Sequence, residues 1–446
     1  MSELPKGWVG STIGEACLIE NGLRKPISLK ERANCQGEFP YYGATGVIDY
    51  LNSYTHEGEY VLIGEDGANL LSKSKPLAFI ANGKYWVNNH AHTLRCLAGS
   101  PNLYLEKYFN SLSLESWVTG SAQPKLTKKN LESIPFPLAP LAEQTRIVEK
   151  LDEVLAQVDT IKVRLDGIPA ILKRFRQSVL AAAVSGKLTE EWRGNSELSW
   201  ENVTLSEIIS PERPISYGVL KPGDYVKDGI ILLRIKDILG DIVSLDSPHR
   251  ISNELSEQYK RTLLKGDEIL ISLVGTLGRI ALVPKSLAGA NVHRNLGVVV
   301  PKQGVVSKFI FYLMKSPSIQ EQIEKSRTGA NQPLLNLGDI KKFAVQLPEP
   351  SEQKEIVRLV DQYFAFADTI EAQVKKAQAR VDNLTQSILA KAFRGELVPQ
   401  DPNDEPADKL LERIAQARKE AEALTKAAKK AQSTKSTTKK KVAKSA

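Results

Sequence analysis

The chain has 446 residues with a formal net charge of +8, of which 42% are apolar and 25% charged, as is typical of a folded protein of two or three domains. Its three cysteines, Cys17, Cys35 and Cys96, have no short paired spacing, which excludes a disulfide framework and argues against a structural zinc site. No apolar run is long enough for a membrane span and the first ten residues lack a signal-peptide pattern, so we expect a cytoplasmic location.

The positive charge is concentrated at the C-terminal end. Residues 426–446 contain eight lysines and no acidic residue, so the rest of the chain is close to neutral. If the body of the protein binds nucleic acid, local basic surfaces must do so, because its overall charge offers no attraction.

The sequence contains an internal repeat, which predicts the domain order. Gly120–Leu188 aligns without a gap with Gly329–Leu397, and 22 of the 69 aligned positions are identical. The shared residues include Gln123-Pro124 and Gln332-Pro333. A shorter match relates Trp8, Thr12 and Glu15 to Trp200, Thr204 and Glu207. The predicted order is a first variable domain over 1–139, a long helix over 140–190, a second variable domain over 191–349, a second long helix over 350–397, and a C-terminal segment over 398–446.

The two variable domains are predicted to be mixed α/β, because short β-branched and aromatic runs alternate with loops rich in Gly, Asn and Pro. Their loops carry the side-chain types that pair with base edges in the major groove of DNA. The candidates in the first domain are Tyr42, Asn69, Lys73, Lys84, Asn89 and His90, and those in the second are Tyr217, Lys221, Arg234, Lys236, Arg279, Arg294 and Asn295. For each of them, ordinary solvated loop polarity is the alternative. A structural role is favoured for the shared Gln-Pro pairs.

Each copy of the repeat contains a predicted long helix, 141–184 in the first copy. Apolar residues recur at alternating steps of three and four, which is typical of a helix that pairs with another helix. We call these positions the seam: Ile147, Leu151, Val154, Val158, Ile161 and Leu165 in the first helix, and Ile356, Val360, Tyr363, Ile370, Val374 and Val381 in the second. The pattern continues through Gly167 and Pro169, so we expect a kinked but continuous helix, although Pro removes a backbone donor.

The two helices are predicted to form an antiparallel coiled coil. The second domain lies between them in the chain, and the two ends of a compact domain tend to lie close together, so the second helix must run back along the first. The alternative is that each amphipathic helix packs on its own domain. The fold class is therefore α+β, with two α/β domains separated by a long antiparallel helix pair and related by a pseudo-two-fold repeat.

The C-terminal segment is predicted to contain a linker, a short helix over 408–431, and a disordered lysine-rich tail over 433–446.

Motifs for catalysis are missing from the sequence. We find no Gly-Lys-Ser/Thr phosphate loop, no motif of an adenine methyltransferase and no nuclease cluster. We therefore expect no catalytic, cofactor-binding or metal-binding residues in this chain.

The motifs resemble those of a known family, the specificity (S) subunit of type I restriction–modification enzymes. The resemblance rests on "PLAEQTRIVEKLD" (140–152), "RFRQSVLAAAVSGKLT" (174–189) and "SILAKAFRGEL" (387–397), and on the domain openings "LPKGW" (4–8) and "LSW" (198–200). It covers nearly the whole chain except about the last fifty residues.

The resemblance implies that the variable domains are target recognition domains, each reading one half of an asymmetric, bipartite DNA site. The helices would set the spacer and dock two methyltransferase (M) subunits, after which restriction-translocase (R) subunits join. S-adenosylmethionine, ATP and Mg²⁺ would belong to those partners, and this chain would be non-catalytic but required for their activities. A stand-alone tandem DNA-binding regulator is the alternative function.

Overall fold

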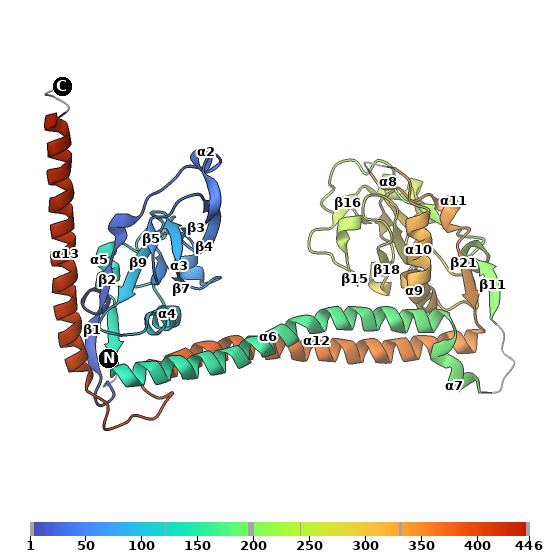
Figure 1. Cartoon of the computed structure of the whole chain (residues 1–446). Helices are drawn as coiled ribbons and strands as arrows, with labels where there is room; N and C mark the ends of the chain where they lie inside the picture. The colour runs from blue at the N-terminus through green and yellow to red at the C-terminus, as the bar shows by residue number, and fades with distance from the viewer. Residues whose placement is uncertain (1–3, 121, 195–199, 241, 330–331, 443–446) are drawn as a thin grey trace. The chain divides into compact units, whose positions relative to one another are not determined.

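The computed structural model describes residues 4–120, 122–194, 200–240, 242–329 and 332–442, with side chains described up to Leu424. The chain forms two compact units (Figure 1). The first unit comprises residues 1–164 and 377–446, and the second comprises residues 165–376. Each unit therefore contains one variable domain and one half of each long helix.

The domain of the first unit is built on two four-stranded sheets. One has the antiparallel order β2-β9-β6-β7, and the other has the order β4-β3-β8-β5 with a parallel β3–β8 pair. The strands are β1 (Val9–Thr12), β2 (Cys17–Ile19), β3 (Gln36–Gly43), β4 (Gly46–Leu51), β5 (His56–Glu57), β6 (Tyr60–Gly64), β7 (Ala78–Ala81), β8 (Lys84–Val87), β9 (Ala91–Cys96) and β10 (Pro135–Leu138). The helices are α1 (Ile13–Ala16), α2 (Leu29–Arg32), α3 (Asn69–Ser72), α4 (Asn102–Ser111) and α5 (Lys128–Glu132), with a 3₁₀ turn η1 (Asn21–Leu23).

The domain of the second unit contains a four-stranded sheet β12-β20-β17-β18, a three-stranded sheet β16-β13-β19 and the pair β14-β15. The strands are β11 (Glu201–Thr204), β12 (Ser216–Tyr217), β13 (Ile230–Leu233), β14 (Ile238–Leu239), β15 (Ile242–Val243), β16 (His249–Ile251), β17 (Ile269–Ser272), β18 (Ile280–Leu282), β19 (Asn291–Val292), β20 (Leu296–Val299) and β21 (Ala344–Leu347). The α-helices are α8 (Asn253–Gln258), α9 (Ser307–Lys315), α10 (Pro317–Lys325) and α11 (Leu337–Ile340), and the 3₁₀ turns are η3 (Leu205–Ile208), η4 (Ile235–Asp237), η5 (Lys260–Thr262) and η6 (Lys285–Leu287).

The two domains share one topology although their sequences differ. Strands β2, β9, β6 and β7 correspond in order and direction to β12, β20, β17 and β18, and the parallel pair β3–β8 corresponds to β13–β19. Each domain is closed by a pair of its first and last strands, β1–β10 and β11–β21. The repeat therefore extends through the variable domains as well as through the helices.

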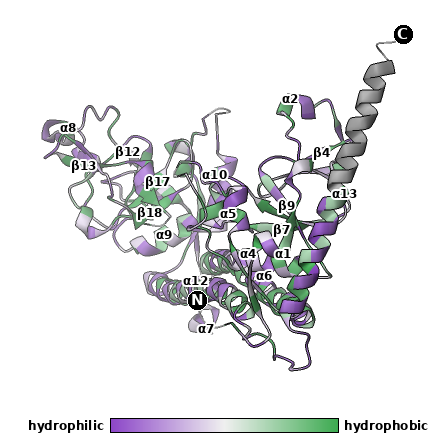
Figure 2. Cartoon of the chain, turned by 90° about the vertical axis from the view of Figure 1, so that its left-hand side faces the viewer, coloured by the Kyte–Doolittle hydropathy of each residue, from purple (hydrophilic) through white to green (hydrophobic). Residues whose placement is uncertain are grey.

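Apolar strands form the core of each domain. Every residue of β6 and of β17 is buried, and Figure 2 shows apolar stretches within the sheet that contains β7 and β9. In the first unit, α4 packs on this sheet and places the rings of Tyr104 and Tyr108 against Phe393. In the second unit, α9 covers the corresponding sheet and places Tyr312 against Phe364 (Figure 1).

The predicted long helices are confirmed as α6 (Leu141–Val184) and α12 (Pro350–Ala392), and α6 is one helix although it contains Pro169. They run antiparallel within each unit. In the first unit Lys162 pairs with Asp382 at 2.8 Å, and in the second Arg176 pairs with Asp368 at 2.6 Å. After α6 follow the 3₁₀ turn η2 (Lys187–Thr189) and α7 (Glu190–Arg193). Gly186 and Gly395 adopt φ values of +76° and +72° just beyond the helices, in the left-handed conformation with which helices commonly end at glycine.

The seam is buried at most of its predicted positions. Ile147, Leu151, Val158, Ile356, Val360 and Val374 are buried, and Val154, Leu165, Ile370 and Val381 are half-buried. Ile161 and Tyr363 are more exposed than the other seam positions, at 44% and 40%, although the Tyr363 ring lies 6.1 Å from the Phe175 ring of α6. Two helices alone cover only one side of each a/d side chain, so burial is complete only where the domain packs on the pair as well. Ile147 and Leu151 lie in such a region, in one apolar cluster with Tyr104 and Ile388.

The C-terminal helix is longer than the sequence analysis predicted. Helix α13 (Ala407–Val442) continues through residues 433–442 of the segment expected to be disordered, and residues 443–446 of that prediction lie outside the described residues. The lysines of this segment favour helix, and no Gly or Pro interrupts it. Its start packs on the first domain through Leu410 and Ile414, and Arg146 pairs with Asp404 at 2.5 Å. Among the described residues, no helix is long and apolar enough to cross a membrane.

Candidate nucleic-acid interface

Two predicted candidates, Asn89 and His90, lie on the first segment of a three-segment ladder of backbone hydrogen bonds at one edge of the first domain. Backbone pairing continues past the end of β6 at Gly64, because the Glu65 N–H donates to the His90 carbonyl at 2.8 Å. On its other side the Leu126 N–H donates to the Glu65 carbonyl at 2.8 Å, and the Gly67 N–H donates to the Pro124 carbonyl at 3.0 Å. The turn 88–90, which carries Asn89 and His90, thus lies beside residues 65–67, and these lie beside residues 124–126.

The second domain has the same ladder with different side chains. The Leu273 N–H donates to the Asn295 carbonyl at 2.9 Å, and the Leu335 N–H donates to the Leu273 carbonyl at 2.9 Å. The Gly275 N–H donates to the Pro333 carbonyl at 2.8 Å. Here the turn 293–295 carries Arg294 and Asn295. We call the segments 88–90 and 293–295 the reader turns.

The third segment of each ladder is a loop with a shared shape. Thr119 and Lys125 exchange backbone hydrogen bonds of 2.9 and 2.8 Å, and Thr328 and Leu334 exchange bonds of 3.0 and 2.9 Å. We call the described residues of these segments, 119–120 with 122–126 and 328–329 with 332–335, the shared loops. Gly120 has a φ of +85°, and an added Cβ would lie 2.7 Å from the Gln123 carbonyl oxygen, so only glycine fits.

Arg24 holds the reader turn of the first domain in place. Its guanidinium donates to the carbonyls of Asn89 and Ala91 at 3.3 and 2.9 Å and pairs with Glu65 at 2.6 Å. Burial alone would raise the pKa of Glu65, but the hydrogen bond from Arg24 and the nearby charges more than offset it, so this pKa is lowered. The His90 Nδ1 lies 2.8 Å from Asp66, while the exposed Asn89 side chain is available to a ligand.

The reader turn of the second domain is more basic. Arg294 is exposed, and its N–H donates to the Val219 carbonyl at 3.0 Å, which brings the exposed Lys221 near the same edge. The exposed Tyr217 lies on β12, opposite Gly297. Burial and then the charges of Arg294 and Arg234 lower the pKa of His293, so this histidine stays neutral and Arg294 supplies the charge of the turn.

Three candidates of the first domain have other roles and are removed from the predicted site. The Asn69 side chain is occupied within its own loop, donating to the Lys75 carbonyl at 3.1 Å and accepting the Lys75 N–H at 2.8 Å. The Lys73 ammonium donates to Gln386 of α12 at 3.2 Å, and burial lowers its pKa. The Tyr42 ring packs on Phe79 and Tyr85 in a buried cluster. Lys84 stays exposed on β8, 4.9 Å from the Tyr54 ring.

The second domain also has one candidate with a structural role. Arg234 is tied to Asp237 at 3.4 Å and to the Ser247 carbonyl at 3.0 Å, so it caps η4 and is removed from the site. Arg279 is exposed and lies beside the ladder, because the Ser272 N–H donates to its carbonyl at 3.0 Å. Lys236 is exposed on η4.

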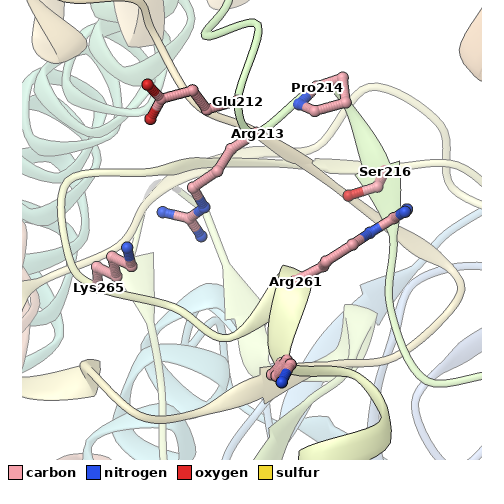
Figure 3. Close-up of a pocket in the computed structure, with 7 residues that line it drawn as sticks. Glu212, Arg213, Pro214, Ser216, Arg261 and Lys265 are labelled. Carbon is pink, nitrogen blue, oxygen red and sulfur yellow. The ribbon is translucent and has the colours of Figure 1, made fainter.

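A basic cleft of about 300 Å³ lies next to β12 in the second domain (Figure 3). Arg213 is fixed in it by Glu268 at 2.8 Å, and the side chains of Lys260, Arg261 and Lys265 are exposed.

Sequence reasoning missed these residues, as it missed Arg24, because their roles depend on strands and turns that are distant in the chain. The Arg24 guanidinium bridges two segments that are far apart in the chain, so no motif in the neighbouring sequence predicts its role. Among the described residues, no group of three His, Cys, Asp or Glu side chains is placed to hold a metal ion.

Comparisons with known proteins agree on one family. A family profile described as "Type I restriction modification DNA specificity domain" matches residues 5–170 and 198–378. The chain is 44% identical to the type I restriction enzyme EcoBI specificity subunit of Escherichia coli over 315 residues, which cover 66% of each chain. It is 34% identical to the StySPI specificity subunit of Salmonella potsdam over 452 residues, which cover 93% of this chain and 96% of that one.

Two solved structures share the fold. One, from a study of complex assembly and conformational transition of the type I R-M system, matches 89% of this chain and 100% of its own with a TM-score of 0.63 at 18% identity. The HsdS subunit from Thermoanaerobacter tengcongensis matches 89% of this chain and 98% of its own with a TM-score of 0.54 at 19% identity.

Proposed function

The chain belongs to the family of type I restriction–modification DNA specificity subunits, and on this premise we propose that it directs such a complex to a bipartite, asymmetric DNA site. Membership in this family favours a subunit of a complex over a stand-alone regulator. Each variable domain reads one half of the site, and the helix pair sets the spacer between the halves.

The observation that carries this proposal is the ladder that is built twice with different side chains. The same backbone hydrogen bonds hold both reader turns, yet one presents Asn89 and His90 and the other presents Arg294 and Asn295. Asn pairs with adenine and Arg with guanine through bidentate hydrogen bonds in the major groove. One scaffold that carries two sets of donors is suited to two different half-sites.

The helix pair offers a surface to a protein partner. In the first unit Val163 and Leu384 are 73% and 46% exposed, and in the second unit Ile171 and Phe366 are 54% and 58% exposed. Contiguous exposed apolar patches mark protein interfaces, and these four side chains could contribute to such a patch on each unit. We assign this surface to the M subunits, one for each unit.

Chemistry is supplied by the partners in this proposal. S-adenosylmethionine is bound by the M subunits, and ATP and Mg²⁺ by the R subunits that join the complex. This chain has no active site of its own, is required for the activities of the assembled complex, and acts in the cytoplasm.

The test is to sequence methylated bases in a host that expresses this chain with its cognate M subunit. We expect one asymmetric site of two short blocks separated by unspecified bases. An Arg294→Ala variant should relax only one block and Asn89→Ala only the other, whereas Lys129→Ala, an exposed change distant in sequence from both turns, should alter neither. A single undivided site, or loss of both blocks in either variant, would contradict the proposal.

A further inference from the structure

Residues shared by two domains of different sequence need a reason that applies to both. For one shared pair the reason is structural. Gln144 and Gln353 are buried at the starts of α6 and α12, and each donates its Nε2–H to a backbone carbonyl at 2.8 Å, that of Ala139 and that of Pro348. The fold therefore requires glutamine at these positions.

No such reason applies to the other shared glutamines, Gln123 and Gln332. Both side chains are exposed, and neither has a hydrogen-bond partner among the described residues. The residues around them do have structural roles. Pro124 and Pro333 accept ladder hydrogen bonds, and Gly329, like Gly120, has a positive φ and room for no Cβ. Both domains thus keep a tight loop whose effect is to present a glutamine to solvent.

The place of these glutamines in the fold indicates their partner. Each shared loop is the third segment of a ladder whose first segment is the reader turn, so both glutamines lie on the edge that we assign to DNA. The bases differ between the two half-sites, and only the sugar–phosphate backbone is the same in both. Amide side chains commonly donate hydrogen bonds to phosphate oxygens, which fix the register of a protein on the duplex without reading sequence.

Building on the function proposed above, we propose that Gln123 and Gln332 each donate a hydrogen bond to a phosphate of the DNA backbone beside their half-site and so position the reader turn. They are positioning residues and read no base. Because glutamine is neutral, it displaces no counterion, so its loss lowers affinity without changing the salt dependence of binding.

The test compares the full chain, assembled with its M subunits, with the double variant Gln123→Ala/Gln332→Ala. We expect about tenfold weaker binding to a duplex that carries the methylated site, with an unchanged salt slope and the same site in the methylome. The double Gln→Glu variant should bind more weakly still, since a carboxylate is repelled by phosphate. The double variant Gln157→Ala/Gln373→Ala changes two exposed glutamines of the long helices and should bind like the parent.

Phosphate mapping localises the contact. In the parent, a neutral methylphosphonate at one backbone position beside each half-site should weaken binding, and the Ala variant should be insensitive to that substitution. A change in the methylated sequence would show that these glutamines read bases, and loss of M-subunit assembly with retained DNA binding would show a protein partner; either overturns the inference. Parental affinity of the Ala variant overturns it as well, while failure of the parent itself to bind DNA would instead refute the proposed function.

Discussion

The Trp8 indole donates its Nε1–H to Glu143 Oε2 over 2.9 Å, and both side chains are buried. This bond joins the opening of the first domain to the first turn of α6. The repeat places Trp200 and Glu352 at the corresponding positions, but there the carboxylate is bound by Thr189 at 2.6 Å and Arg193 at 2.5 Å. The buried Trp200 Nε1 and Glu352 Oε2 have no partner among the described residues.

The first prediction concerns this bond. Trp8→Phe keeps an aromatic ring but leaves Glu143 Oε2 buried without its donor, so we expect a loss of about 1–3 kcal/mol in the free energy of unfolding. Urea unfolding monitored by circular dichroism measures it. Trp192→Phe is the matched control, because Trp192 is 45% exposed and should change stability little. Equal effects of the two substitutions would show that the bond contributes nothing.

The second prediction is a loss of stability at mildly acidic pH. His56 lies against the rings of Tyr60 and Tyr85, and burial, followed by the charge of Arg24, lowers its pKa from 6.5 to about 4. The folded chain keeps His56 neutral while the unfolded chain protonates it near pH 6.5. The contribution of His56 is therefore complete above pH 6.5 and is lost as the pH falls towards 4.

The measurement for His56 is the urea midpoint at pH 7 and pH 5. The difference between the two midpoints should be smaller in His56→Phe than in the parent. Comparing the two proteins at each pH cancels the groups they share, including His92, whose pKa is also lowered by burial, and Glu106 and Glu143, whose pKa values burial raises and which act in the opposite direction. An unchanged difference would mean that His56 is protonated in the folded chain.

The third prediction separates two seam positions that look alike in the sequence. Ile147 is fully buried, so Ile147→Asp should cost about 3 kcal/mol or more by placing an unpaired charge in the core. Ile161 is 44% exposed, so Ile161→Asp should be much milder. In the second unit, Ile356→Asp should be severe and the exposed Ala372→Asp mild. Thermal melts of the four variants measure these losses of stability. A loss for Ile161→Asp as large as that for Ile147→Asp would contradict this prediction and indicate that Ile161 is buried.

Features encoded by neighbouring residues could be predicted from the sequence, whereas features that depend on contacts between distant segments could not. A period of 3.5 residues is repeated along the chain, so the heptad pattern was sufficient to predict α6 and α12. The order β2-β9-β6-β7 joins strands that are distant in the chain, and no local pattern encodes it. The candidates in the reader turns were chosen from side-chain type and loop position alone, and their contact with DNA stays a prediction. Asn69 and Arg234 were misassigned because their partners, Lys75 and Ser247, become visible only when the loops fold.

The strand pair that joins the two ends of each domain provides matched junctions for exchanging one domain for the other, which is the basis of the last prediction. Strands β1 and β10 pair antiparallel, with Val9 opposite Leu138, and β11 pairs with β21, with Glu201 opposite Leu347. Both ends of each domain therefore leave from one strand pair, beside the start of a long helix. A chimera in which residues 198–349 are replaced by a second copy of residues 4–139 keeps these junctions.

In the chimera both units carry the same reader turn, Asn88-Asn89-His90, on equivalent helix starts. Because α6 and α12 run antiparallel within each unit, two identical readers should recognise two identical half-sites in inverted orientation. With its M subunits the chimera should methylate a palindrome built from the first half-site and leave the parent's asymmetric site unmodified. Sequencing of methylated bases reads both outcomes at once. Continued modification of the parent site would mean that residues 198–349 do not specify a half-site, and the assignment of one half-site to each domain would be wrong.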